Sequence, residues 1–200
     1  MVAFGGKSKE VNVYSTSSFE RVFSYDFGEE VCFLQFCPLQ TSPSLLLCVG
    51  ASGKISFLLS SELTRRLLNG STELRSLQLT DIILDVSLSG ELIAVATCNG
   101  VRFFSWDMEL VKKKDYPFHV KSRVSGDVSR LACSLNPQHT FYLISDVNTI
   151  YEVDYRTDEI HRSYNGHHGT VWCLRYSPDG NSFISGSDDS SIRLWTAERN

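Results

Sequence analysis

The chain has 200 residues, of which 42% are apolar and 21% charged, with only 13 glycines and 5 prolines. This composition excludes a disordered, collagen-like or low-complexity chain, and the length suffices for one or two domains with a substantial core. The 19 basic and 23 acidic residues give a net charge of −4, so nucleic-acid binding through bulk positive charge is not expected. No apolar run is long enough to span a membrane.

The start of the chain, residues 1–7, lacks the basic region and the long apolar stretch of a secretory signal peptide. We therefore expect a cytoplasmic protein, with the nucleus as a second location. The six cysteines include no C-x-x-C pair and lie inside apolar runs, so we predict small buried hydrophobic side chains, with disulfides or zinc as the alternatives. They are Cys32, Cys37, Cys48, Cys98, Cys133 and Cys173.

Short apolar or alternating runs, separated by Gly, Ser, Asn and Asp, dominate the chain, and helical periodicity is nearly absent. In the first clear run, Phe23, Tyr25 and Phe27 share one face at a period of two. The strand candidates, in chain order, are 21–27, 44–50, 92–97, 141–144 and 182–185. The best helical candidate is the short stretch 60–68. Many short strands between turn signals predict an all-β sandwich, barrel or propeller.

A pattern of apolar, any, apolar, and aromatic or apolar residue recurs along the chain. Its last residues are 14, 58, 104, 153 and 195, so the steps are 44, 46, 49 and 42 residues. Each step has room for four strands with their turns. A propeller blade has such a period, whereas a single sandwich has no reason to repeat at this spacing.

Residues 166–195 carry the most distinctive motif. Its pieces are Gly166-His167, Ser177-Pro178-Asp179-Gly180, Ser185-Gly186-Ser187-Asp188-Asp189 and Ile192-Arg193-Leu194-Trp195. The second piece predicts a tight turn, because Pro presets φ and Gly accepts a positive φ. The motif closely resembles the WD repeat. Residues 31–38 align with 171–178 without gaps, but Phe27 stands where His167 would be, so the earlier repeats are degenerate.

This resemblance identifies the chain as a member of the WD-repeat family and implies an all-β WD40 β-propeller, or an incomplete propeller arc. We expect four full four-stranded blades plus a leading half blade, in one domain over 1–200. The expected repeats are 1–15 (partial), 16–60, 61–106, 107–155 and 156–195. Because the family usually closes a seven-bladed ring, we favour an arc that is shortened or completed by another chain. A closed ring of about five unusual blades is the alternative.

The family places an Asp, a His, a Ser or Thr and a Trp of one blade in a hydrogen-bonded chain. By resemblance these are His167, Ser185, Asp189 and Trp195, with Ser187 as the second choice for the hydroxyl. A buried indole N–H needs an acceptor, and a hydroxyl can relay that bond to an imidazole. A hydrolase triad is the competing hypothesis. We set it aside because Ser185 lies in a strand-forming run rather than a G-x-S-x-G elbow. No catalytic residue is predicted.

Within the family, residues 76–195 resemble the serine/threonine kinase receptor-associated proteins, also called unrip. The resemblance is carried by Asp154 to Ile160, then by Tyr164 to Gly169 and the final Leu194-Trp195. That group implies a non-enzymatic scaffold of the complex in which survival-of-motor-neuron and Sm proteins assemble spliceosomal RNA-protein particles, or a signalling adaptor. Subunit i of translation initiation factor three resembles the chain less well, because it lacks the Leu-Trp ending.

Propellers of this family bind partners at the start of the first strand of a blade and just before the turn Asp. The corresponding candidates are Thr170, Trp172 and Asp188 in the last repeat, and Glu30 and Cys32 in the first full repeat. An exposed Trp surrounded by polar residues is a suitable interface anchor. The alternative is that Trp172 only packs against neighbouring loops.

One basic cluster stands out: Lys112, Lys113 and Lys114, with Lys121 and Arg123 nearby. It could contact RNA, but no aromatic residues are clearly interleaved for base stacking, so a solvated outer strand is preferred and RNA is expected at most indirectly. The expected tetrad already uses His167 and Asp189. We therefore predict no metal site and no cofactor.

Overall fold

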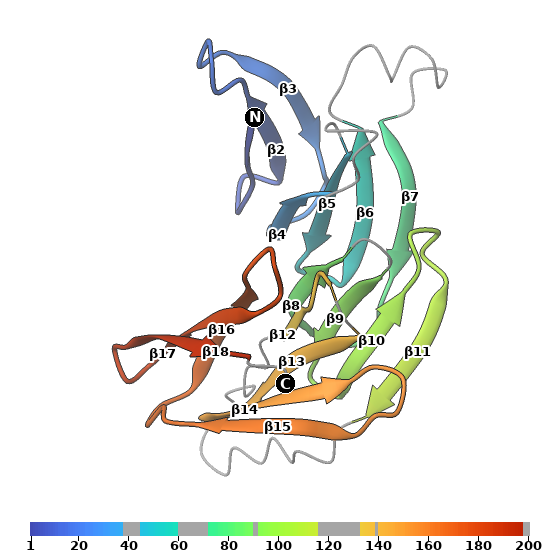
Figure 1. The fold of residues 1–200 in the computed structure, drawn as a ribbon. Coiled ribbons are helices and arrows are strands. Elements are labelled where there is room, and N and C mark those ends of the chain that lie inside the picture. The colour runs from blue at the N-terminus through green and yellow to red at the C-terminus, as the bar shows by residue number, and fades with distance from the viewer. Residues whose placement is uncertain (38–44, 60–71, 90–91, 116–132, 139, 198–200) are drawn as a thin grey trace, which may run out of the picture. The chain divides into compact units, whose positions relative to one another are not determined.

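The computed structural model describes residues 1–37, 45–59, 72–89, 92–115, 133–138 and 140–197 (Figure 1). Regular structure in these residues is exclusively β, which confirms the predicted all-β fold class. The helical candidate at 60–68 lies outside the described residues, as do Lys121 and Arg123. No helix capable of crossing a membrane occurs in the described ranges.

The strands are short and follow one another at tight turns. They are β1 (Val2–Phe4), β2 (Glu10–Tyr14), β3 (Arg21–Asp26), β4 (Val31–Phe36), β5 (Leu45–Gly50), β6 (Lys54–Leu59), β7 (Glu73–Gln78), β8 (Ile83–Leu88), β9 (Ile93–Thr97), β10 (Gly100–Phe104), β11 (Leu110–Asp115), β12 (Cys133–Leu135), β13 (Phe141–Asp146), β14 (Thr149–Asp154), β15 (Ile160–Asn165), β16 (Val171–Tyr176), β17 (Ser182–Ser187) and β18 (Ile192–Thr196). All five predicted strands correspond to observed ones.

The chain divides into two compact units, 1–82 and 83–200. The first unit holds the sheets β1-β2-β3 and β4-β5-β6-β7. The second holds β8-β9-β10-β11, β12-β13-β14-β15 and β16-β17-β18. Every sheet is an antiparallel meander in which strands consecutive in sequence are paired. The expectation of one domain over 1–200 stays a prediction.

Sheets and sequence repeats are offset by one strand. The leading segment 1–15 contains β1 and β2, and each of the four following repeats contains four strands. The first strand of each repeat completes the preceding sheet, as β15 does when it pairs with β14. In chain order, the described residues therefore form a three-stranded sheet, three four-stranded sheets and a final three-stranded sheet. The offset arises because the repeats were counted to a sequence pattern that lies in the next-to-last strand of each four-stranded sheet. The last strand of that sheet is therefore assigned to the following repeat.

The first strands of three sheets share a β-bulge near their start. The register shifts fall between Val31 and Phe33 in β4, Ile83 and Asp85 in β8, and Val171 and Cys173 in β16. A bulge bends the strand and re-aims the extra residue. In β4 and β16 that residue, Cys32 or Trp172, is exposed. The gapless alignment of 31–38 with 171–178 thus reflects a shared backbone irregularity.

The core of the first unit lies between its two sheets. Val11, Val13 and Phe23 of the first sheet belong to one buried cluster with Leu46 and Leu58 of the second. The alternating face predicted for residues 21–27 takes part in this cluster, because Phe23 and Phe27 are buried and Tyr25 packs against it. The alternation in the sequence therefore marks the buried face of β3 correctly.

Two further cores hold the second unit together, one on each face of the sheet β12–β15. The first strands of the three sheets, β8, β12 and β16, are also joined by side chains. Ser87 Oγ in β8 accepts a hydrogen bond from the backbone N–H of Leu135 in β12 at 2.8 Å. Ser134 Oγ accepts one from the backbone N–H of Tyr176 at 3.1 Å. Each serine thus links the first strand of one sheet to the first strand of the next.

An ion pair also connects these first strands, β8, β12 and β16. Arg175 of β16 places its Nη1 atom 3.2 Å and its Nη2 atom 3.3 Å from the two carboxylate oxygens of Asp85 in β8. Asp85 Oδ2 also accepts a hydrogen bond from the backbone N–H of Cys133 in β12 at 3.0 Å. Burial is the largest single influence and lowers the pKa of Arg175, but the charge of Asp85 and the hydrogen bond to it, with smaller effects of neighbouring groups, together raise the pKa above its ordinary value.

The cysteines are only partly buried, and all are free thiols. Cys37, Cys48 and Cys133 are buried as predicted, and burial raises the pKa of Cys37 to about 12. The prediction is wrong for Cys32 and Cys173, which are exposed. Cys32 is the bulge residue of β4, and Cys173 follows the bulge of β16. Because a bulge changes the direction of the side chains, these cysteines are exposed although their neighbours in sequence are apolar.

Candidate functional site

Four residues of the last repeat form a continuous hydrogen-bonded chain in the sheet β16–β18. Trp195 Nε1 donates to Ser185 Oγ at 2.7 Å. Ser185 Oγ lies 2.6 Å from His167 Nε2, and His167 Nδ1 lies 2.8 Å from Asp189 Oδ2. The structure thus brings together His167, Ser185, Asp189 and Trp195, which we call the tetrad.

The chemistry of these groups sets the direction of each bond. An ionised carboxylate only accepts, so the Nδ1–H of His167 donates to Asp189. In the neutral ring Nε2 then accepts, and the hydroxyl of Ser185 donates to it while accepting from the indole N–H of Trp195. Each ring nitrogen of His167 and the hydroxyl of Ser185 thus has a hydrogen-bond partner. Buried polar groups require such partners, and both residues are almost fully buried.

Asp189 is the anchor of the tetrad. The hydroxyl of Ser191 donates to its Oδ1 at 2.6 Å, and the backbone N–H of His168 donates to its Oδ2 at 3.0 Å. These bonds, led by that from Ser191, hold the pKa of Asp189 well below its usual range. Sequence reasoning missed Ser191, although its position two residues after the turn Asp could have suggested it.

The tetrad does not present a nucleophile. Ser185 is 1% exposed, and its oxygen already accepts the indole N–H. A hydrolytic serine needs an accessible oxygen at a strained elbow, whereas Ser185 lies inside β17. What the tetrad does is join the turn 188–191 to the segment that leads into β16.

That junction places the partner-binding candidates of the last repeat beside one another. The backbone N–H of Asp188 donates to the carbonyl of Thr170 at 3.0 Å. The indole N–H of Trp172 donates to Asp188 Oδ1, and 42% of Trp172 remains exposed. The aromatic ring is therefore oriented by a turn that the tetrad holds in place.

Val147 extends this surface and was missed by the sequence reasoning. It lies in the turn between β13 and β14 with φ of 49° and is 50% exposed. Its carbonyl accepts a hydrogen bond from the backbone N–H of Val171 at 2.7 Å, directly before Trp172. We call Val147, Thr170, Trp172 and Asp188 the Trp172 rim. A β-branched residue at positive φ is unusual, but no local sequence signal reveals it.

Glu30 and Cys32 lie in the first unit and repeat the geometry of the rim. The carbonyl of Glu30 accepts a hydrogen bond from the backbone N–H of Ala51 at 2.9 Å, as that of Thr170 does from Asp188. Both Glu30 and Cys32 are exposed. The neighbouring Glu29 accepts from the backbone N–H of Ser52 at 2.7 Å, so this turn is also held by a carboxylate.

The lysine cluster lies on β11, the outer strand of its sheet, and its charges are paired. Lys112 Nζ is 2.7 Å from Asp158 Oδ1, and Lys114 Nζ is 3.5 Å from Asp158 Oδ2. Lys113 Nζ is 3.2 Å from Asp115. Lys112 also donates to the carbonyl of Tyr155. The three lysines share two carboxylates, and Asp115 also pairs with Arg102, so each ammonium group has a partner but the cluster keeps part of its positive charge.

No group of three or more His, Cys, Asp or Glu side chains in the described part of the chain has the arrangement of a metal site. His167 and Asp189 face each other within the tetrad, and the backbone N–H of the neighbouring His168 donates to the same carboxylate. This polar cluster is therefore occupied by its own hydrogen bonds.

Comparison with known proteins agrees with this architecture. The WD40 family (WD domain, G-beta repeat) matches residues 158–196. The serine-threonine kinase receptor-associated protein of Rattus norvegicus is 30% identical over 128 residues, covering 62% of this chain and 34% of the relative. That of Dictyostelium discoideum is 34% identical over 113 residues, covering 56% and 36%. The eukaryotic translation initiation factor 3 subunit I of Nematostella vectensis is 49% identical over 37 residues, covering 18% and 12%. The matched part thus spans about a third of the receptor-associated relatives.

Proposed function

We propose that this chain, whose residues 158–196 match the WD40 family and which is similar to the serine-threonine kinase receptor-associated proteins, is a non-enzymatic scaffold that binds other proteins within a complex. The Trp172 rim is the observation that carries this proposal. It combines a half-exposed aromatic ring, an exposed Val147 and a carboxylate, on turns that hydrogen bonds hold rigid. Rigid aromatic anchors of this kind dominate protein-binding surfaces.

We further propose that the complex assembles RNA and protein, with Sm and survival-of-motor-neuron components among its members, in the cytoplasm and the nucleus. The similarity to the receptor-associated group supports this finer assignment. RNA would be bound by other subunits, because the lysines of β11 are paired with carboxylates.

Two other scaffold roles have specific support. The 37-residue match to translation initiation factor 3 subunit I supports a place in translation initiation. The name of the receptor-associated relatives supports a signalling adaptor that associates with a serine-threonine kinase receptor. Co-purification separates the three: Sm proteins, small ribosomal subunits or a receptor kinase should follow the tagged protein.

The test of the proposal is a Trp172→Ala variant, with Phe19→Ala as the control. Phe19 is an aromatic residue that is 82% exposed in the first unit. We expect Trp172→Ala to weaken partner capture at least about tenfold in quantitative pull-downs. Its Tm should stay near that of the wild type, because the ring is half-exposed and the turn that orients it is held by the tetrad, and Phe19→Ala should capture normally.

A large fall in Tm with unchanged capture would show that Trp172 only packs its neighbouring loops, and would overturn the assignment of the rim. A fluorophosphonate probe tests the non-enzymatic part of the proposal, because covalent labelling of Ser185 would contradict it.

A further inference from the structure

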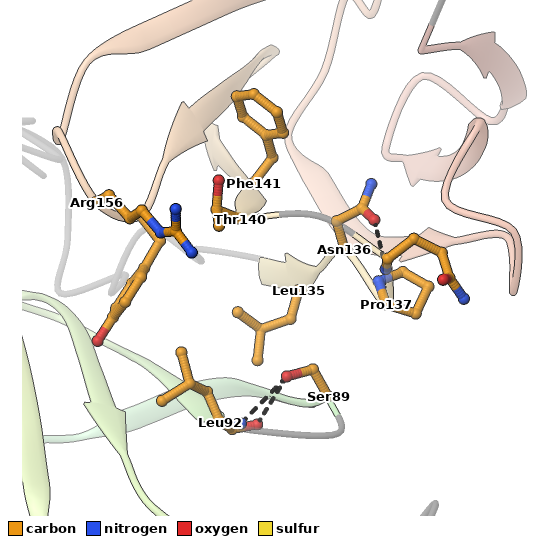
Figure 2. A pocket seen from close by; sticks show the side chains of 10 residues that line it. Ser89, Leu92, Leu135, Asn136, Pro137, Thr140, Phe141 and Arg156 are labelled. Carbon is orange, nitrogen blue, oxygen red and sulfur yellow. Dashed lines mark hydrogen bonds between the residues drawn. The ribbon is translucent and has the colours of Figure 1, made fainter. Parts of the chain in front are cut away.

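A pocket of about 580 Å³ lies in the second unit, between the sheets β8–β11 and β12–β15 (Figure 2). Its walls come from the connections between β8 and β9, between β12 and β13, and between β14 and β15. The volume falls within the range of pockets that hold small ligands or the side chains of a bound peptide.

The pocket is separate from the Trp172 rim. Ser134 Oγ accepts from the backbone N–H of Tyr176, so the ends of β12 and β16 lie side by side. The pocket opens beyond the end of β12, whereas Trp172 lies at the start of β16. The two surfaces are therefore at opposite ends of their strands, and the function of one does not depend on the other.

Much of the lining is apolar. Figure 2 shows Leu92 and Leu135 next to each other, with Phe141 farther away beyond Thr140. Tyr155 completes the wall, and its ring contacts that of Phe103 with 4.8 Å between centroids. These side chains form a wall on which aliphatic or aromatic groups of a ligand can bury apolar surface.

Hydrogen bonds hold the pocket open. Asn136 is buried, and its Nδ2 donates to the carbonyl of Gly180 at 3.0 Å while its Oδ1 accepts from the backbone N–H of Gln138 at 2.9 Å. The backbone N–H of Tyr155 donates to the carbonyl of Thr140 at 2.7 Å. A ligand would therefore meet a wall that is already ordered, which lowers the cost of binding.

Arg156 supplies the charge of the pocket. Its backbone N–H donates to Asp154 Oδ1 at 2.6 Å, and Figure 2 shows its guanidinium directed toward the interior. The guanidinium makes no hydrogen bond or ion pair with any described residue, and the other described lining residues are uncharged. Lys112 and Lys114, on the neighbouring β11, are engaged by Asp158.

From this combination of an apolar wall and one unpaired cation, we propose that the pocket binds a segment of a partner protein in which a carboxylate adjoins an aliphatic or aromatic side chain. The planar guanidinium matches a carboxylate with two parallel hydrogen bonds. The leucines and Phe141 receive the neighbouring apolar side chain. A peptide is favoured over RNA because aliphatic residues stack poorly on bases, a single cation contributes little to phosphate binding, and the chain carries a net charge of −4.

The experiment is an NMR titration of the protein, labelled at its leucine methyl groups, with the peptide Ac-Gly-Phe-Leu-Asp-Gly-amide. Two peptides are controls: one has Asn in place of Asp, and one has Ser in place of both Phe and Leu. We expect the first peptide to shift the methyl signals of Leu92 and Leu135 saturably. Each control peptide should bind at least about tenfold more weakly.

Arg156→Gln tests the cation, and Arg21→Gln, which changes an exposed arginine of β3, is its matched control. Arg156→Gln should weaken the first peptide at least about tenfold, while Arg21→Gln should bind as the wild type does. Equal binding of the Asp and Asn peptides, or normal binding by Arg156→Gln, would overturn the proposal. So would shifts of the same methyl signals by hexauridylate but not by the peptide.

Discussion

Ser185 has one hydroxyl group and two partners, the indole N–H of the partly buried Trp195 and Nε2 of the buried His167. An unpaired buried donor or acceptor costs more free energy than a hydrogen bond contributes, because the group has lost its water. The stability of the last sheet therefore depends on this oxygen more than on the hydroxyl of Ser187 at the end of the same strand.

Ser185→Ala should lower the free energy of unfolding by about 2 kcal/mol or more, because both partners are left unsatisfied. Ser187→Ala is the control: its hydroxyl donates to the carbonyl of Gly169 at 2.9 Å in a partly exposed position, so it should cost about 1 kcal/mol or less. Urea unfolding of the two variants measures the difference. Equal losses would mean that the hydroxyl of Ser187 stabilises the sheet as much as that of Ser185 does.

The second prediction at this scale concerns pH and Asp189. Its pKa is lowered in the folded protein, chiefly by the hydroxyl of Ser191, so folding favours the ionised form. The resulting stabilisation is complete above the ordinary carboxyl range, near pH 4, and is lost as the pH falls further. The Tm of Asp189→Ala should therefore lie furthest below that of the wild type near pH 7.

Thermal melts at pH 7 and at successively lower pH test this prediction, and the gap in Tm should narrow below about pH 4. Glu20→Ala, which removes an exposed carboxylate of the first unit, should show no comparable gap at any pH. A gap for Asp189→Ala that stayed constant on acidification would contradict the role of the ionised carboxylate.

Among the structural elements, the outer strand β11 depends on a close approach at Gly100. Gly100 has φ of +135° and pairs with Asp115, and an added Cβ would lie 2.2 Å from the carbonyl oxygen of Lys114. Neither the backbone angle nor the available space suits a side chain. The sheet β8–β11 can therefore add its fourth strand only with glycine at this position.

Gly100→Ala should lower the free energy of unfolding by about 2 kcal/mol or more and weaken the pairing of β11. Gly6→Ala is the matched control, since nothing lies within 4 Å of a Cβ at that position. Hydrogen exchange should show faster exchange of the β11 amides in Gly100→Ala alone. Unchanged protection of β11 would contradict the expected clash.

The contacts between β8, β12 and β16 could not be predicted from the sequence. Asp85 and Arg175 are 90 residues apart, and no sequence motif links them, yet they pair across β8, β12 and β16. The cysteines of the apolar run 31–37 were expected inside, but the run does not reveal the bulge that exposes Cys32. Local patterns report which residues alternate, and they do not report which strands become neighbours.

For the molecule as a whole, the charges of β11 distinguish an RNA-binding protein from one that binds proteins. The triple variant Lys112→Ala, Lys113→Ala, Lys114→Ala should retain no less RNA than the wild type in filter binding at low salt, because these lysines are paired with Asp115 and Asp158. It should melt lower, since Lys112 joins β11 to the turn after β14.

The control for this variant is Lys7→Ala with Lys9→Ala, which removes two exposed lysines of the first unit. That double variant should leave both the filter retention and the Tm unchanged. A loss of RNA retention confined to the triple variant would show that the cluster binds RNA directly.

The repeat period and the all-β class follow from local order in the chain, and the members of the tetrad follow from the resemblance of the final motif to the WD repeat. Alternation, turn residues and the spacing of the final motif act between near neighbours, so the sequence alone reveals them. The assignment of Trp172, Thr170 and Asp188 to one surface follows from the same motif.

Folding in three dimensions was needed to place Val147 beside Trp172, to pair Lys112 and Lys114 with Asp158, and to form the pocket at Arg156. Each of these depends on segments from different sheets or turns that meet in space. Such contacts are set by the packing of apolar faces, and a side chain distant in sequence leaves no periodic trace of the partner it will find.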